Sequence, residues 1–282
     1  MGKVVFVPGA SGSFGALTAR ALADAGHTVY AGISRITNHN ADITRELREH
    51  ARRNSADLRP VELEVEDRRS VDSVVRAATA EAGRIDVVVH TTAPAVFGPA
   101  ESFTPYQLSQ IYDLNVLSSQ RVNRAVLPQM RQRRSGLLIW MGNFLPCAAA
   151  PYLAPYFAAR AALDLLARSY AAELTPFGID THVLVPPSLP SDAGEPAGLV
   201  HPDDIRTAEA YEELCAGVMR RAKQWLAHSG LADAELTRAV IAVVENPKAA
   251  VPLSEENATL SPGELRRSLD LDDPEQPQER DI

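Results

Sequence analysis

The sequence has little cysteine and no excess of positive charge. Its two cysteines, Cys147 and Cys215, are too few for a framework of disulfides or for a four-thiolate metal site. The 28 lysines and arginines are outnumbered by 36 aspartates and glutamates, which argues against nucleic acid or an anionic membrane as the main partner. Sparse cysteine also fits a reducing compartment, so we expect a cytoplasmic protein.

Long hydrophobic runs are also missing, with one stretch that needs a closer look. The N-terminus has no apolar run long enough for a secretion signal. Residues 136–159 carry no charge and could span a bilayer as a helix, but Pro146, Pro151 and Pro155 would break that helix. We therefore interpret this stretch as a buried strand, a loop and the start of a helix.

Short apolar runs alternate with amphipathic helical patterns along most of the 282 residues. Strands that are apolar on both faces and separated by helices predict a doubly wound parallel α/β sheet with helices on both faces. We expect one domain over residues 1–255 and an acidic tail over 256–282, disordered from about residue 270. The predicted strands are 4–7, 28–33, 61–65, 85–90, 137–141, 179–185 and, weakly, 251–253; the predicted helices are 17–25, 71–82, 108–131, 156–174, 203–228 and 233–245.

A glycine-rich loop joins the first predicted strand to the first helix. Gly9, Gly12 and Gly15 are spaced three residues apart. Such a turn lets backbone N–H groups approach a phosphate at the positive end of the helix dipole. The loop predicts dinucleotide binding, although an ordinary strand-to-helix turn would have the same glycines. Ser11, Ser13 and Phe14 complete the predicted loop contacts.

The second predicted strand ends in Ser34-Arg35, about 20 residues after the last loop glycine. An acidic residue near this position would bind a ribose 2′-hydroxyl, whereas a hydroxyl and a guanidinium suit a 2′-phosphate. The pair favours NADP(H) over NAD(H). The alternative is that Arg35 is a solvated surface residue.

Residues 3–250 resemble the short-chain dehydrogenase/reductase superfamily in the order and spacing of several segments. The glycine loop, the stretch 61–67, Asn115, the Tyr156–Arg160 pair and the stretch 172–180 carry the resemblance. It implies a Rossmann-type fold, a nicotinamide cofactor, and a homodimer or homotetramer assembled through long helices. It also implies that the cofactor contacts Glu64, Val65, Thr91, Thr92, Ala93, Tyr156, Arg160, Pro186 and Ser188, and that residues 188–230 cover the substrate.

Several positions around the implied catalytic site depart from the family pattern. Asn143 stands 13 residues before the tyrosine, where the family has serine, and Arg160 replaces the family's lysine. The resemblance gives Tyr156 the role of general acid/base. Arg160, one helical turn away, can supply positive charge but cannot give up a proton. Asn143 would orient the substrate or satisfy loop backbone groups, and Asn115 would support the helix geometry.

Three functions remain open. The leading one is an NADP(H)-dependent oxidoreductase that reduces a carbonyl or oxidises an alcohol on a small to medium organic substrate. The second is a cofactor-independent lyase or cyclase with a Tyr–Arg pair, as in the similar halohydrin dehalogenases. The third is a non-catalytic binding or assembly subunit. His90 has no second histidine at ligand spacing, so we predict no metal.

Overall fold

The computed structural model describes residues 2–92, 94, 96–142, 151–184, 200–211, 217 and 232–248. Six parallel strands form one sheet in the order β3-β2-β1-β4-β5-β6. The order reverses between β1 and β4, so the predicted doubly wound parallel sheet is confirmed. The strands are β1 Val4–Pro8, β2 Thr28–Ile33, β3 Leu58–Glu62, β4 Val87–His90, β5 Gly136–Met141 and β6 Ile179–Leu184.

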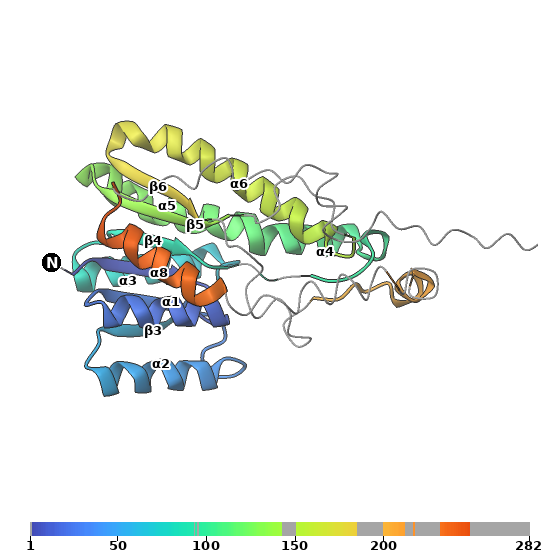
Figure 1. The fold of residues 1–282 in the computed structure, drawn as a ribbon, viewed down its shortest axis with the longest axis horizontal. Coiled ribbons are helices and arrows are strands. Elements are labelled where there is room, and N and C mark those ends of the chain that lie inside the picture. Colours follow the sequence, from blue (N-terminus) through green and yellow to red (C-terminus); the bar gives the residue numbers. More distant parts are fainter. Residues whose placement is uncertain are drawn as a thin grey trace, which may run out of the picture.

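Helices cover both faces of this sheet (Figure 1). Successive side chains of β1 point to opposite faces, so Val5 and Val7 join one hydrophobic cluster while Val4 and Phe6 join the other. The first cluster includes α1 (Ser13–Asp24), α2 (Ala41–Asn54) and α8 (Ala232–Glu245). The second includes α3 (Arg68–Ala82), α4 (Pro105–Tyr112), α5 (Ser118–Arg133) and α6 (Ala154–Leu174).

The edge of the sheet at β3 differs from the sequence prediction. The strand occupies 58–62 instead of 61–65, with Leu58 opposite Val29 of β2. Only Leu58 is fully buried in this strand, so the apolar run gave a weak signal. Pro60 lies within it, which an edge strand tolerates. Helix α2 was not predicted, because its buried positions are only Thr44 and Leu47.

The long helix predicted over 108–131 is interrupted. Helix α4 begins with a capping box, in which Thr104 and Gln107 bond each other's backbone. It is followed by a π-helical turn, η2 (Asp113–Leu117), and then by α5. The predicted strand at 251–253, the tail and much of the helix predicted over 203–228 lie outside the described residues, although 205–211 are helical.

The uncharged stretch 136–159 begins as β5, and α6 starts near its end at Ala154. Residues 143–150 between them lie outside the described part of the chain. Pro155 stands in the first turn of α6, where a missing N–H leaves no helical bond unmade. Within the described residues, no helix has the length and the hydrophobicity needed to cross a bilayer.

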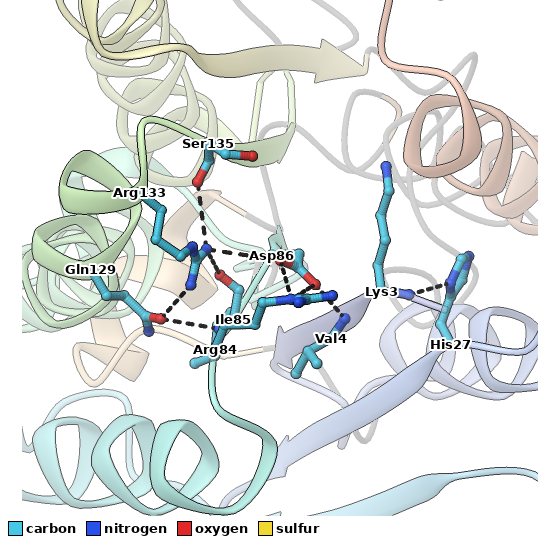
Figure 2. A network of polar contacts seen from close by, with 9 residues as sticks. All are labelled: Lys3, Val4, His27, Arg84, Ile85, Asp86, Gln129, Arg133 and Ser135. Carbon is cyan, nitrogen blue, oxygen red and sulfur yellow. Dashed lines mark hydrogen bonds and ion pairs between the residues drawn. The ribbon is translucent and has the colours of Figure 1, made fainter. Parts of the chain in front are cut away.

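A polar network ties β1 to β4 at their amino ends (Figure 2). The carboxylate of Asp86 accepts the backbone N–H of Val4 at 3.0 Å and the Nε–H of Arg84 at 3.0 Å. Arg133 lies 3.8 Å from the same carboxylate and donates to Gln129 Oε1 at 2.9 Å. Each of these side chains has a partner, so the network acts as a structural brace at this end of the sheet.

Candidate active site

The glycine loop lies where β1 and β4 end. Gly9 has a φ of +90°, and a Cβ built on it would lie 2.8 Å from the backbone nitrogen of Thr92. A Cβ on Gly15 would lie 2.4 Å from the carbonyl oxygen of Gly9. The Ala10 N–H donates to the carbonyl of Gly32 at 2.9 Å. Neither position has room for a side chain, because atoms of the loop itself and of Thr91 and Thr92 already occupy that space, so this tight turn requires glycine at both positions.

Helix α1 presents its amino end at this loop. Its N-cap is Gly12, no side chain caps it, and no acidic residue occupies its first turn. The partial positive charge of the helix end is therefore not neutralised by a capping or first-turn carboxylate, which suits a phosphate. Ser11 is half-buried and Ser13 exposed, whereas the Phe14 side chain belongs to the hydrophobic core. Only the backbone of Phe14 is thus available to a cofactor.

Thr91 joins the ends of the two central strands. Its N–H and its hydroxyl both donate to the carbonyl of Pro8, at 3.4 and 2.7 Å. Thr92 contacts Gly9, as described above. This is the point where the strand order reverses, and open α/β sheets bind ligands in the crevice there. The sequence-predicted loop residues and the threonines are therefore brought together.

A second group lies at the end of β2. Arg35 is exposed, has a φ of +46°, and donates its backbone N–H to Glu64 Oε1 at 2.8 Å. The Nδ2 of Asn40 donates to the carbonyl of Ser34 at 2.6 Å and to its hydroxyl at 3.3 Å. The sequence predicted Ser34, Arg35 and Glu64 separately but did not predict that the carboxylate binds the arginine's own backbone. Val65 follows, and its carbonyl accepts from Arg121 at 3.4 Å.

Tyr156 and Arg160 lie on helix α6 at the carboxyl end of the sheet. Both are 3% exposed. The ring of Tyr156 meets Phe157 edge-on, with centroids 5.3 Å apart. The guanidinium of Arg160 donates to the carbonyl of Met141, the last residue of β5. The helix therefore places a phenol and a permanent cation inside the protein at the end of the sheet where the glycine loop lies.

Burial makes His90 a neutral group. Its Nε2 lies 2.9 Å from Oδ1 of Asn123, and its ring centroid lies 4.5 Å from that of Trp140. Burial, helped by the charge of the nearby Arg160 and opposed by the bond to Asn123, lowers the pKa of His90 to about 4. An imidazole with this pKa is uncharged at neutral pH and is a poor proton donor there. Asn123 was missed, since nothing in the local sequence distinguishes it.

Asn115 lies in the π-helical turn η2 and is fully buried. Its Nδ2 donates to the carbonyl of Ile111 at 3.0 Å and to that of Pro94 at 3.4 Å. Its Oδ1 has no partner among the described residues. Turns of this type are frequent at functional sites, and this one links α4 to the loop after β4. The supporting role of Asn115 in catalysis stays a prediction.

Four predicted site residues lie outside the described part of the chain, namely Ala93, Asn143, Pro186 and Ser188. Within the described ranges, no three side chains of the ligating types come together as a metal site. What the geometry does bring together is a glycine loop, an open helix end and a buried tyrosine with its arginine. A nucleotide with phosphates fits this loop, because neither a capping side chain nor a first-turn carboxylate neutralises the amino end of α1.

The chain matches the family model described as short chain dehydrogenase over residues 3–198. A short chain dehydrogenase of Pseudocercospora fijiensis is 28% identical over 216 residues, 76% of this chain and 66% of that protein. A 3-ketodihydrosphingosine reductase of Bacteroides thetaiotaomicron is 28% identical over 184 residues, 65% of this chain and 63% of that protein. The chain thus spans slightly less than two thirds of these relatives.

A solved structure of a short-chain dehydrogenase from Streptomyces avermitilis has a TM-score of 0.75 with this chain at 26% identity. The match covers 96% of this chain and 93% of that one. Proteins with this fold and family pattern are generally oxidoreductases that act on alcohols or carbonyl groups with a nicotinamide cofactor. The family model, the relatives and the fold agree, and the chain belongs to the short chain dehydrogenase family.

Proposed function

We propose that this protein is an NADP(H)-dependent oxidoreductase that reduces a carbonyl group or oxidises an alcohol on a small to medium organic substrate. The observation that carries the proposal is the buried Tyr156, one helical turn from the buried Arg160, at the end of the sheet where the glycine loop lies. We further propose a cytoplasmic homodimer or homotetramer. The nicotinamide, when bound, supplies or accepts the hydride.

Tyr156 acts in this proposal as the general acid/base on the substrate oxygen. An uncharged phenol donates its proton to the oxygen of a carbonyl as that oxygen gains negative charge. The positive charge of Arg160 favours the phenolate that remains. Because the guanidinium does not release a proton, Arg160 holds charge in place and does not pass the proton on. Asn143 would orient the substrate oxygen by donating an amide N–H, and Asn115 would support the helix beside it.

The preference for NADP(H) rests on the side chain of Arg35. The backbone N–H of Arg35 is bound by Glu64, and its exposed side chain can reach a phosphate at the end of β2. The Glu64 carboxylate favours NAD(H) instead. Its negative charge repels a 2′-phosphate, and its oxygens can accept a hydrogen bond from a ribose hydroxyl. Arg35 and Glu64 therefore predict opposite cofactor preferences. A titration with both cofactors shows which of the two residues decides the preference.

The test is calorimetric titration of the full chain with NADPH and with NADH. We expect NADPH to bind at least about tenfold more tightly, and Arg35→Ala to remove about 1–2 kcal/mol of that preference. Arg45→Ala is the matched control, since Arg45 is an exposed arginine of α2 that is paired with Asp42. Tighter binding of NADH would contradict the NADP(H) assignment. Binding of neither nucleotide would favour non-redox chemistry by the Tyr–Arg pair, or a non-catalytic role.

Activity is tested by NADPH oxidation with a panel of ketones that runs from cyclopentanone to a 17-ketosteroid. Turnover of one or more ketones is the expected result. Tight NADPH binding without turnover of any panel member, in either direction, would favour the binding or assembly subunit. The panel is graded by size because the substrate class is proposed only as small to medium.

A further inference from the structure

Gln107 is a buried polar residue with an unusual set of partners. It lies in the first turn of α4 and is 5% exposed. Its Oε1 accepts the backbone N–H of Thr104 at 3.2 Å, which is an ordinary capping-box contact. The same oxygen accepts the N–H of Asp203 at 3.0 Å, and its Nε2 donates to the carbonyl of His201 at 3.0 Å. Both ends of the amide therefore bind a backbone segment 94 to 96 residues away.

That segment, residues 200–204, is also paired with the chain that follows β4. Val200 forms a parallel bridge with Val96, and its carbonyl accepts the N–H of Phe97 at 3.0 Å. Pro202 packs against Gly98 so closely that a Cβ on that glycine would lie 2.8 Å from the proline ring. The Asp204 N–H also donates to the carbonyl of Ser102 at 3.4 Å. The amide of Gln107 thus supplies two of the hydrogen bonds that hold residues 200–204 in register.

The chain after β4 is in turn joined to the segment just before α6, the helix that bears Tyr156. The ring of Phe97 stacks on that of Tyr152, with centroids 5.6 Å apart. The Gly98 N–H donates to the carbonyl of Tyr152 at 2.9 Å. Tyr152 has a φ of +67°, which a non-glycine residue rarely adopts unless its surroundings hold it there. It lies two residues before α6 begins at Ala154 and four residues before Tyr156. Contacts therefore run without a gap from residues 200–204 to the helix that bears Tyr156.

We propose that Gln107 is a positioning residue that holds residues 200–204 against residues 96–98 and so fixes one wall of the substrate site beside Tyr156. The part that concerns substrate rests on the proposed function. In Figure 1 the gold segment that includes these residues lies beyond the carboxyl ends of the strands. The contacts predict that Gln107 controls apparent substrate affinity and leaves nucleotide binding unchanged, because the glycine loop is not among its partners.

Four variants separate this role from simple helix capping. Gln107→Ala removes every side-chain contact. Gln107→Glu keeps an oxygen for the Asp203 amide but places a second oxygen against the carbonyl of His201. Thr104→Ala removes the hydroxyl that caps α4 and leaves the Gln107 amide intact. Gln110→Ala is the matched control, since Gln110 is an exposed glutamine on the same helix.

The first readout is amide hydrogen exchange of the full-length protein, which needs no substrate. We expect the Asp203 and Phe97 amides to exchange about tenfold faster in Gln107→Ala and several-fold faster in Gln107→Glu. They should be unchanged in Gln110→Ala and in Thr104→Ala. Equal exchange in Gln107→Ala and Gln110→Ala would overturn the proposal, and so would equal acceleration in Thr104→Ala.

The second readout is kinetic, with whichever ketone of the panel the wild-type protein reduces. Both Gln107 variants should raise KM about fivefold or more, with kcat and the NADPH dissociation constant within about twofold of wild type. Loss of NADPH affinity in parallel with KM would instead indicate general damage to the fold and would overturn the proposal. If the wild-type protein reduces no ketone, the proposed function fails, while the exchange result still decides whether Gln107 holds the segment.

Discussion

The two ends of the central strands treat their polar groups differently. At the amino end, Asp86 binds Arg84 and the backbone of β1, and Arg133 is held between Asp86 and Gln129. Toward the carboxyl end, Asn115 Oδ1 and Trp140 Nε1 are buried without a hydrogen-bond partner among the described residues. At the amino end, His27 Nε2 is also buried without a hydrogen-bond partner among the described residues, although its Nδ1 accepts the N–H of Lys3 at 3.1 Å, and Thr181 Oγ1 of β6 is a further case.

We propose that this difference separates stability from function along one sheet. A buried polar group without a partner costs free energy that a paired one does not, so it is tolerated mainly where a ligand or water completes it. The amino end has mostly paired charges and the arrangement of a brace, whereas Asn115 and Trp140 leave unfilled hydrogen-bonding capacity toward the carboxyl end, where Tyr156 and Arg160 also lie. Substitutions at the two ends should therefore change different measurable quantities.

The largest effect is expected at Tyr156. Tyr156→Phe removes the phenolic proton and keeps the ring, so kcat should fall about 10²–10⁴-fold. The free energy of unfolding should change by no more than about 1 kcal/mol, because the apolar packing remains. Steady-state kinetics and urea denaturation of the same preparation measure both. Activity within twofold of wild type would remove the tyrosine from the mechanism.

A second effect is a loss of stability in acid caused by His90. Its pKa is lowered from 6.5 to about 4 in the folded state, so between these values the unfolded chain binds more protons than the folded one. Stability should fall as the pH drops from 6.5 toward 4, by about 3 kcal/mol from this group, and the contribution is complete above pH 6.5. Urea denaturation at pH 7 and pH 4.5 should show a smaller loss in His90→Asn. An identical pH dependence in both proteins would contradict the neutral buried imidazole.

At the opposite end, Asp86→Ala should lower the free energy of unfolding by about 2 kcal/mol, because it leaves Arg84 and the Val4 amide without their acceptor. The kcat of the folded fraction should be unchanged. Asp72→Ala is the control, since its ion pair with Arg68 is exposed and should contribute no more than about 0.5 kcal/mol. A loss of kcat in Asp86→Ala without a loss of stability would contradict the division between the two ends.

The smallest difference in stability is expected between two glycines that both have a positive φ. Gly83 ends α3 with a φ of +79° and has open space around it, so Gly83→Ala should cost about 1 kcal/mol. Gly9→Ala adds a clash with Thr92, and it should cost about 1 kcal/mol more and also abolish NADPH binding. Thermal denaturation and the calorimetric titration separate the two variants. NADPH affinity that survives in Gly9→Ala would mean that the loop is an ordinary turn.

The sequence was informative wherever the local pattern determined the outcome. The parallel sheet followed from strands that are apolar on both faces, and the site was predicted from the glycine spacing and from Tyr156 with Arg160. The sequence failed where long-range contacts decided. Helix α2 buries too few apolar residues to be recognised, and the π-helical turn leaves no pattern of its own. The bonds from Gln107 to residues 201 and 203 join segments that no local spacing relates.

Pro60 in the edge strand β3 makes this edge a poor partner for a strand of another copy of the protein. The carbonyl of Asp57 accepts the N–H of Val29, and the N–H of Leu63 donates to the carbonyl of Ile33. The backbone N–H and C=O groups of the odd-numbered residues in this strand therefore point toward β2. The backbone of Pro60 therefore points away from β2, toward the unpaired edge of the sheet, and proline has no N–H to donate to another strand there. An edge of this kind resists the strand-by-strand addition that leads to aggregates. Growth of the sheet past β3 is thereby blocked at its middle residue.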